Sequence, residues 1–304
     1  MNLTEIRNIL NDEDIMLTKS LGQTFMHDQN QLRKIVGLAK LTPDDQVIEI
    51  GPGLGPLTGL MLQSAGHVTA IETDRRLVKL LEERFGEQGN FNLKHADALK
   101  VIRMTEFDWS VHKLVANLPY SIASPLLIDL AASAGRPHTM IVTLQLEVVR
   151  RMLAGPDSRE YGVLALLIGL HYVTGEWFTI PRGSFYPEPN VDSGCIELLR
   201  RETQLLPPGL CPVFKKITKR VFSERRKKMM KLLKRDWPEA AVAEIFKTLG
   251  LDEQIRAERV TLEQFVEITQ HLSRAEPARV RKSSMLSMRM TRSSAGGLAA
   301  RCTG

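Results

Sequence analysis

Short apolar segments alternate with amphipathic ones through the first half of the chain. Five runs of four to six residues are largely apolar and mostly rich in β-branched residues, which is typical of buried strands. Between them lie helical patterns; residues 75–85, for example, place Leu77 and Leu81 on one side. This alternation predicts an α/β fold with a parallel sheet covered by helices on both faces. The predicted strands are residues 46–50, 67–71, 91–95, 113–116 and 139–144.

The pattern changes at a cluster of prolines in the last third of the chain. After one more predicted strand, residues 191–199, the sequence Pro207-Pro208-Gly209 interrupts the alternation. Beyond it only helical spacing recurs, and Thr261 is suited to cap the last helix. We therefore predict a domain boundary near residue 205, followed by an all-helical domain. The predicted helices are residues 213–222, 225–233, 238–249, with Pro238 in the first turn, and 262–272.

Composition limits the class of protein. A chain of 304 residues suggests about two domains, and an apolar share of 43% suits a soluble protein with a real core. The longest apolar run, residues 163–170, is too short to cross a bilayer, which takes about 20 residues. The acidic N-terminus argues against a targeting peptide. Cys195, Cys211 and Cys302 fit neither a disulfide framework nor a metal site, so we expect a cytoplasmic protein without a metal.

The net charge of +6 is distributed unevenly along the chain. Residues 213–235 carry +10 and residues 275–304 carry +5, which leaves −9 on the remainder. A concentrated basic segment is typical of proteins that bind polyanions, nucleic acid above all, although basic residues can also merely solvate a helix face. From about residue 274 the sequence is Arg, Ser, Met and Gly without periodicity, which predicts a disordered basic tail.

A glycine-rich turn follows the first predicted strand. Gly51, Gly53 and Gly55 separate that strand from a predicted helix over residues 57–65. Glycines at the carboxyl end of a strand allow a tight turn and a close approach of the backbone to a ligand. About 20 residues later the next strand ends at Glu72, where a carboxylate can bind a ribose diol. The combination predicts a nucleotide-like cofactor.

The spacing of these glycines favours S-adenosyl-L-methionine over a dinucleotide. Dinucleotide sites use a third glycine for a pyrophosphate at the helix N-terminus, whereas this turn is Gly-x-Gly-x-Gly and follows Glu49. Glu49 could face the positive amino or sulfonium group of the cofactor, or hold the loop by accepting backbone N–H bonds. Asp97, after the third strand, could accept a hydrogen bond from the cofactor's adenine or cap the next helix.

The sequence Asn117-Leu118-Pro119-Tyr120 ends the fourth predicted strand, at the edge where open α/β sheets bind ligands. The exocyclic amine of adenine is a poor nucleophile because its lone pair is delocalised into the ring. The Asn117 side-chain oxygen and the Leu118 carbonyl can accept its two N–H bonds and favour a nucleophilic nitrogen. Pro119 stiffens the turn, and Tyr120 offers a ring on which a base can stack. The motif predicts methyl transfer to an adenine amine; the alternative is a plain turn.

Blocks of sequence in one order, from about Lys19 to Leu272, carry a resemblance to a known family. They include residues 19–26, 49–53, 70–74, 97–98, 117–120, 145–151, 154–156, 184–193, 222–227 and 256–265. On these blocks the chain resembles the ribosomal RNA adenine N6-dimethyltransferases, the kasugamycin-sensitivity enzymes that modify small-subunit rRNA. The tail after about residue 274 has no counterpart in the family.

The resemblance implies both a fold and an activity. The fold is a Rossmann-like class I methyltransferase domain, residues 19–205, which follows an N-terminal extension, residues 1–18. A small helical rRNA-binding domain, residues 206–273, and the tail, residues 274–304, complete the chain. The implied activity is dimethylation of N6 of two adjacent adenosines in a 3′-terminal hairpin loop of small-subunit rRNA, as a step in ribosome biogenesis. We expect a monomer whose partner is the rRNA or the immature small subunit.

The resemblance also implies roles for individual residues. Thr24 and Met26 replace the family's usual Asn or His and Leu, but keep the order of polar then apolar. The implied cofactor contacts are Thr24, Met26, Gly51, Gly53, Glu72, Asp97 and Asn117. The implied catalytic residues are Asn117, Leu118, Pro119, Tyr120 and Phe185, with the target base between Tyr120 and Phe185. The implied RNA contacts are Arg225, Arg226, Lys227 and Lys228.

Three other functions are weighed against this one. The erythromycin-resistance methyltransferases of large-subunit rRNA are close relatives, but residues 184–193 and 256–258 favour the small-subunit group. A non-catalytic RNA-binding assembly factor is disfavoured by the intact motif at residues 117–120. An NAD-linked oxidoreductase is disfavoured by the glycine spacing and by the lack of a dehydrogenase catalytic constellation.

Overall fold

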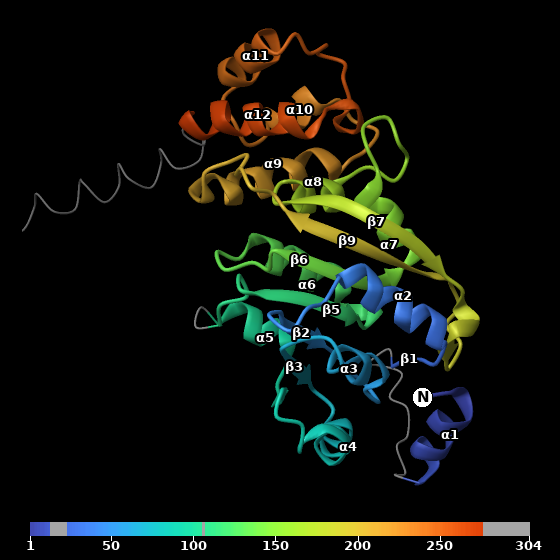
Figure 1. Ribbon diagram of the computed structural model, residues 1–304. Helices are drawn as coiled ribbons and strands as arrows, with labels where there is room; N and C mark the ends of the chain where they lie inside the picture. Colours follow the sequence, from blue (N-terminus) through green and yellow to red (C-terminus); the bar gives the residue numbers. More distant parts are fainter. Residues whose placement is uncertain (13–22, 105–106, 276–304) are drawn as a thin grey trace, which may run out of the picture. The chain divides into compact units, whose positions relative to one another are not determined.

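The computed structural model describes residues 1–12, 23–104 and 107–275. The chain divides into two compact units between Leu205 and Leu206, and each unit is described by itself (Figure 1). The predicted basic tail lies outside the described residues from position 276 onward, as do residues 13–18 of the N-terminal extension. Across the described ranges, none of the helices is long and apolar enough to span a membrane.

The first unit is built on a seven-stranded sheet of order β4-β3-β2-β5-β6-β9-β7. The five strands from β4 to β6 run parallel, as predicted, and the structure lengthens three of them by one or two residues. These strands are β2 (Gln46–Ile50), β3 (His67–Glu72), β4 (Phe91–His95), β5 (His112–Asn117) and β6 (Thr139–Gln145).

The sheet is not wholly parallel, which corrects the prediction from the sequence pattern. β9 (Ser193–Arg200), predicted as residues 191–199, pairs antiparallel with β6, and β7 (Tyr172–Ile180) pairs antiparallel with β9 at the sheet edge. The pattern missed β7 because an edge strand is largely exposed and its register shifts between Thr174 and Trp177. No continuous apolar run marks such a strand.

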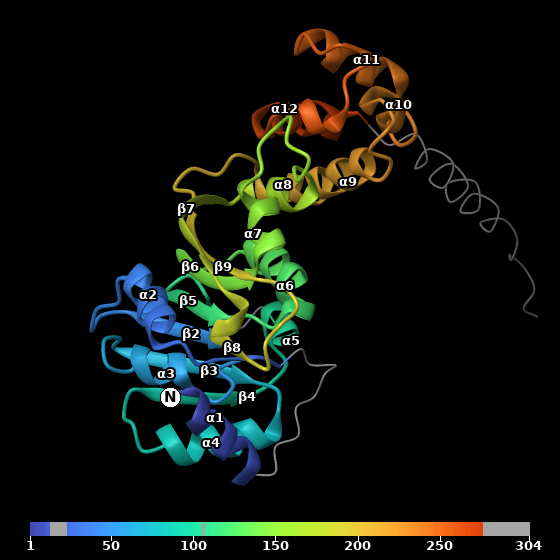
Figure 2. The same ribbon diagram turned by 90° about the vertical axis from the view of Figure 1, so that its right-hand side faces the viewer.

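Successive strand residues point into two helical layers, which lie on opposite faces of the sheet (Figure 2). Ile48 and Met140 belong to one buried cluster, whereas their neighbours Val47 and Ile141 belong to another. This is the period of two expected of strands covered on both faces. The first cluster includes side chains of α5 (Ala98–Arg103), α6 (Tyr120–Ala132), α7 (Leu146–Leu153) and α8 (Val163–Gly169), and the second those of α2 (Gln29–Ala39) and α3 (Pro56–Met61).

Two helices and a small second sheet complete the first unit. α4 (Arg75–Phe85) matches its predicted bounds, whereas α3 ends at Met61, four residues before the predicted end. α1 (Leu3–Asp12) places Ile6 in one buried cluster with Phe25 and Leu77, so part of the expected N-terminal extension packs in the body of the unit. β1 (Phe25–Met26) pairs antiparallel with β8 (Phe185–Tyr186) and thus joins distant parts of the sequence.

The second unit is all helical, as predicted. It contains α9 (Cys211–Phe222), α10 (Met229–Leu233), α11 (Glu239–Thr248) and α12 (Leu262–Arg274). Phe214 and Phe265 meet edge to face in its core, with ring centroids 6.4 Å apart. Thr261 caps α12 as predicted, and Pro238 precedes α11 instead of occupying its first turn. The described residues also form short 3₁₀ helices at Arg182–Ser184 in the first unit and at Pro208–Leu210 and Ala257–Arg259 in the second.

The predicted helix over residues 225–233 is wrong in its first half. The N–H of Met229 donates to the carbonyl of Ile255 at 2.9 Å, which removes it from any helix begun at residue 225. The N–H of Lys227 instead closes a turn on the carbonyl of Glu224 at 2.8 Å. The basic residues 225–228 therefore lie on an exposed turn between α9 and α10.

Candidate functional site

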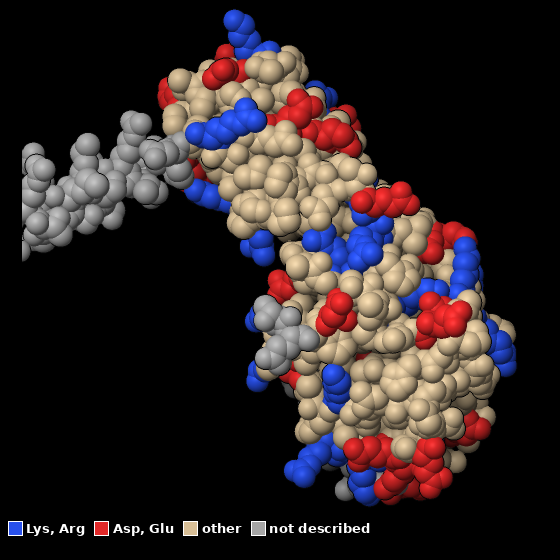
Figure 3. Space-filling view, turned by 60° about the vertical axis from the view of Figure 1, so that its left-hand side comes forward, with Lys and Arg blue, Asp and Glu red and all other residues tan. Residues whose placement is uncertain are grey.

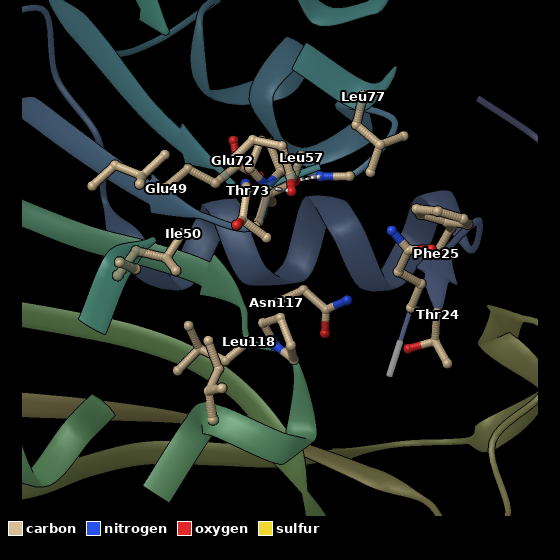
Figure 4. Close-up of a pocket in the computed structure, with 18 of the residues that line it drawn as sticks. Thr24, Phe25, Glu49, Ile50, Leu57, Glu72, Thr73, Leu77, Asn117 and Leu118 are labelled. Atoms are coloured by element: carbon tan, nitrogen blue, oxygen red, sulfur yellow. Dashed lines mark hydrogen bonds between the residues drawn. The ribbon is translucent and has the colours of Figure 1, made fainter. Parts of the chain in front are cut away.

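A pocket of about 280 Å³ lies at the carboxyl ends of β2, β3 and β5 (Figure 4). These strands are parallel neighbours, so the glycine turn, the acid that ends β3 and the motif after β5 meet at one edge of the sheet. The structure brings together all the residues predicted as cofactor contacts: Thr24, Met26, Gly51, Gly53, Glu72, Asp97 and Asn117.

The glycine turn needs its glycines for conformation and for space. Gly51 and Gly53 have φ values of +67° and +61°, which side-chain-bearing residues rarely adopt. A Cβ on Gly53 would lie 2.9 Å from Cδ1 of Phe25, and one on Gly51 would lie 3.3 Å from Cδ of Pro119. The turn is therefore closely packed against both β1 and the motif after β5.

Glu49 is buried in the wall of the pocket at 2% exposure. Its Oε2 accepts a hydrogen bond from the Thr58 hydroxyl at 2.5 Å. Burial, helped by the neighbouring carboxyl of Glu72, raises the pKa of Glu49 to about 8 against the opposing effect of the Thr58 hydrogen bond. The carboxyl thus holds α3 through a side-chain hydroxyl, not through the backbone N–H bonds considered from the sequence. A contact with the cofactor's cation stays a prediction.

Glu72 is fixed in the pocket wall by the backbone around it. Its Oε1 accepts hydrogen bonds from the N–H groups of Thr73 at 2.7 Å and Asp74 at 2.9 Å. Its Oε2 lies 3.4 Å from the N–H of Gly53, which ties the end of β3 to the glycine turn. Burial raises the pKa of Glu72, and the three N–H donors oppose that shift.

Asp97 both lines the pocket and caps a helix. Its Oδ1 accepts a hydrogen bond from the N–H of Leu99 at 2.9 Å, at the start of α5. The helix cap considered from the sequence is therefore confirmed. The contact with the cofactor's adenine stays a prediction, and the capping bond is compatible with it because Asp97 also faces the pocket.

Sequence reasoning assigned no role to two residues that hold this site together. Gln23 lines the pocket and donates to Oδ2 of Asp74 at 2.9 Å, so it ties the segment before β1 to the end of β3. The guanidinium of Arg76, with Gln23, holds the pKa of Asp74 at about 2. Gln23 belongs to a block shared with the family, which was a usable signal. Thr58, the partner of Glu49, lies inside a helix and carried none.

Asn117 presents an unused acceptor to the pocket. Its Oδ1 is buried and has no hydrogen-bond partner among the described residues. Buried polar atoms are normally hydrogen-bonded, so a buried carbonyl oxygen in a pocket wall is suited to accept an N–H from a ligand. The next residue is fixed, because the N–H of Leu118 donates to the carbonyl of Thr143 in β6 at 3.1 Å.

In this structure, Tyr120 and Phe185 do not form two accessible rings between which a base could bind. Neither ring is among the residues that line the pocket. The Tyr120 hydroxyl hydrogen-bonds to Oγ of Ser193 at 2.6 Å, and burial raises the pKa of Tyr120. Phe185 is only 2% exposed and packs in the cluster that contains Met26, its partner across the β1–β8 pair. The sequence could not show this pairing of short strands.

The pocket wall is acidic. Glu49, Glu72 and Asp97 line it, and none of its described lining residues is Lys or Arg. A pyrophosphate would meet carboxyl groups without a cation to balance it, so a ligand without phosphate is favoured there, even though burial keeps the carboxyl of Glu49, with its pKa of about 8, mostly protonated at neutral pH. The pocket therefore does not suit a dinucleotide. Arg225, Arg226, Lys227 and Lys228 do not line it; all four are exposed on the turn of the second unit.

Comparison with known proteins places this geometry in one family. A family model described as ribosomal RNA adenine dimethylase matches residues 16–274. The chain is 34% identical over 278 residues to a ribosomal RNA small subunit methyltransferase A of Syntrophus aciditrophicus, covering 89% of this chain and 99% of that protein. Among solved structures, the 23S rRNA methyltransferase ErmE is 26% identical with a TM-score of 0.63, covering 82% of this chain and 99% of that one. A dimethyladenosine transferase of Plasmodium falciparum is similar in fold, at 24% identity and a TM-score of 0.71, covering 82% and 98%.

Proposed function

This chain belongs to the ribosomal RNA adenine dimethylase family, and we propose that it transfers methyl groups from S-adenosyl-L-methionine to small-subunit rRNA. The targets are N6 of two adjacent adenosines in a 3′-terminal hairpin loop. The observation that carries the proposal is the buried, unpartnered Oδ1 of Asn117 beside the glycine turn. An acceptor in that position suits an exocyclic adenine amine.

The pocket wall supports S-adenosyl-L-methionine as the cofactor. The Glu72 carboxyl, oriented by three backbone N–H groups, suits a ribose diol. Gly51 and Gly53 line the pocket with backbone that carries no side chain, and Asp97 is available to an adenine amine. The acidic wall without Lys or Arg suits a ligand that is positive and carries no phosphate. When bound, this cofactor supplies an electrophilic methyl group on a sulfonium.

The last residue of β5 and the turn that follows it then activate the nucleophile. Asn117 Oδ1 accepts one N–H bond of the adenine amine, and the Leu118 carbonyl accepts the other. The bond from the Leu118 N–H to Thr143 fixes the orientation of this part of the turn. Accepting both bonds favours a tetrahedral nitrogen, with its lone pair available for attack. The methylated ammonium is acidic enough to lose its proton to water, so no side chain needs to act as a strong base.

Tyr120 is the stacking ring that we retain in this proposal. Its hydroxyl is held by Ser193, which fixes the ring at the start of α6. Stacking of the base on Phe185 would require that ring to leave its packing against Met26. We therefore assign the first contact with the target base to Tyr120, and an additional contact of Phe185 only to a rearranged state.

The test is transfer of tritiated methyl groups to unmethylated small-subunit particles. Digestion and chromatography should identify N6,N6-dimethyladenosine. Large-subunit particles from a methylation-deficient strain are the matched control, because ErmE, a 23S rRNA enzyme, shares the fold. Methylation of the large-subunit particles alone would replace this function with the erythromycin-resistance type. Retained cofactor binding without transfer to either particle would favour a non-catalytic assembly factor.

A further inference from the structure

Three arginines gather at the edge of the first unit's sheet that lies opposite the pocket. β9 runs antiparallel to β6, so its last residue, Arg200, lies beyond the pair of Leu199 with Thr139, at the amino end of β6. β6 has seven residues, and at roughly 3.3 Å per residue this edge is about 20 Å from the carboxyl end of β6. Figure 3 brings this side of the molecule forward and shows Lys and Arg side chains on it, with Asp and Glu side chains among them.

Backbone carbonyl groups hold these arginines in place. Nη1 of Arg200 donates to the carbonyl of Arg136 at 3.0 Å, and Nε of Arg201 donates to the carbonyl of Gly169 at 2.8 Å. Nε of Arg136 donates to the carbonyl of Ser133 at 2.8 Å. A carbonyl orients a guanidinium without neutralising it. Within the described part of the chain, neither Arg200 nor Arg201 forms an ion pair.

The surrounding groups leave this edge positive. Arg136 also contacts Nδ1 of the buried His171 at 2.7 Å, and burial together with Arg136 lowers the pKa of His171 to about 4. The imidazole is thus a neutral partner for the guanidinium at neutral pH. The pKa of His138 is lowered by burial and by Lys113 and Arg200.

Two acidic groups near this edge have partners of their own. Asp45 is taken up by the ion pair with Lys113, at 2.9 Å. Asp108 is near enough to Arg200 for that charge to help lower its pKa, after its hydrogen bonds to Ser110. Neither of these two carboxylates forms an ion pair with Arg200 or Arg201 within the described residues.

We propose that Arg136, Arg200 and Arg201, the arginine edge, form a second binding site for RNA phosphate. An arginine fork can donate two N–H bonds to one phosphate, and pre-oriented guanidinium groups lose little side-chain entropy on binding. Contacts to phosphate position a protein without reading sequence. The identity of the RNA as small-subunit rRNA rests on the proposed function. Because this edge and the pocket lie at opposite ends of the sheet's strands, about 20 Å apart along β6, the edge would engage a whole particle more strongly than an isolated hairpin loop.

The test compares two charge-matched double variants of the full chain. Arg200→Gln with Arg201→Gln removes two charges from the edge and keeps amide N–H donors for the carbonyl groups. Arg33→Gln with Lys79→Gln removes the same charge from exposed side chains of α2 and α4. The measurement is affinity for unmethylated small-subunit particles at several salt concentrations. We expect the edge variant to bind about tenfold more weakly near 0.1 M salt, with a log–log salt slope reduced by about 1 to 2.

Further measurements separate this site from the pocket and from a folding defect. The edge variant should bind S-adenosyl-L-methionine and methylate a short hairpin within about twofold of the parent protein. Arg200→Lys with Arg201→Lys restores the charge and should recover most of the salt slope, even if the Gln variant is less stable. A parent protein that methylates no rRNA would refute the proposed function, while the salt slopes on the same particles would still decide this site.

Three results would overturn the inference. The first is an unchanged salt slope in the edge variant. The second is an equal loss in the Arg33 and Lys79 control, which would reduce the effect to net charge. The third is crosslinking of residue 200 or 201 to a ribosomal protein in place of RNA, which would assign the edge to an acidic protein surface. Crosslinks to rRNA with a reduced slope only in the edge variant would support it.

Discussion

The pocket of the first unit and the basic turn of the second unit use polar residues in opposite ways. In the pocket, Glu49 and Glu72 are buried and each is held by specific donors, and the acceptor of Asn117 is oriented but unused. On the turn, residues 225–228 are exposed and follow one another without regular structure. Ligand binding in the pocket should therefore depend on the exact positions of its polar atoms, whereas binding by the turn should depend on the number of charges that it carries. Substitutions should separate the two in rate, cofactor affinity and salt dependence.

The largest effect is expected from Asn117→Ala. The substitution removes the buried acceptor that would orient the adenine amine, while β5 keeps its backbone pairing. We expect the rate of methyl transfer to fall by about 100-fold to 1,000-fold, as for loss of one preorganised polar group in an active site. Transfer of tritiated methyl groups under single-turnover conditions measures this effect.

Two further variants sharpen this result. Asn117→Asp keeps an acceptor oxygen and should lose less activity than the Ala variant. Asn92→Ala changes an exposed residue of β4 and should leave the rate unchanged. Near-normal turnover by Asn117→Ala would refute the role of Asn117 as the acceptor for the adenine amine, because no other described side chain occupies its position in the pocket wall.

The second-largest effect is expected from Gly53→Ala, which should weaken binding of the cofactor. An alanine at φ +61° costs roughly 1 kcal/mol of conformational strain. Its Cβ would lie 2.9 Å from Cδ1 of Phe25, so β1 must also shift. We expect the dissociation constant of S-adenosyl-L-methionine to rise by about tenfold or more in calorimetry, because 1.4 kcal/mol corresponds to a factor of ten. Gly89→Ala, with no atom within 4 Å, is the matched control; equal losses in both would refute the close-approach argument.

The third effect tests the basic turn. Arg225→Gln with Arg226→Gln should weaken binding to small-subunit particles by about tenfold and reduce the salt slope by about 1 to 2. Cofactor affinity should not change, since neither residue lines the pocket. Lys247→Gln with Arg274→Gln removes equal charge from exposed positions of α11 and α12. A salt slope that is unchanged, or that changes equally in the control, would mean that the turn is merely solvated.

The sequence identified what is carried by local pattern and missed what depends on distant partners. β2 and α4 match their predicted bounds because a buried apolar run and helical spacing are visible within ten residues; β4 also matches its predicted bounds, although it is a partly exposed edge strand. β7 was missed because its apolar residues form no continuous run and its register shifts between Thr174 and Trp177, and the β1–β8 pair was missed because two-residue strands are defined by their partners.

The same distinction applies to the site. The predicted cofactor contacts all line one pocket, since the carboxyl ends of neighbouring parallel strands must meet. The burial of Phe185 followed from a pairing that no local signal encodes. The basic residues were correctly marked as a charged segment. Their helix was wrong, because the carbonyl of Ile255 captures the N–H of Met229.

The smallest effect is expected in the stability of the folded protein. It tests whether burial keeps the carboxyl of Glu49 neutral. The folded-state pKa of Glu49, about 8, lies above the ordinary value of 4.5 for a glutamate carboxyl. The folded protein therefore keeps a proton that the unfolded chain has lost between these values, so this contribution to stability is present at low pH and lost as pH rises toward 8. Glu49→Gln removes the titration and keeps an acceptor for Thr58. We expect its melting temperature to exceed that of the parent by several degrees at pH 8 and by much less at pH 5. Glu72 titrates in the same direction in both proteins, so the difference between their pH profiles isolates Glu49. Glu87→Gln, at an exposed position, should leave the profile unchanged; parallel profiles for Glu49→Gln and the parent would show that the buried carboxyl is ionised in the folded protein.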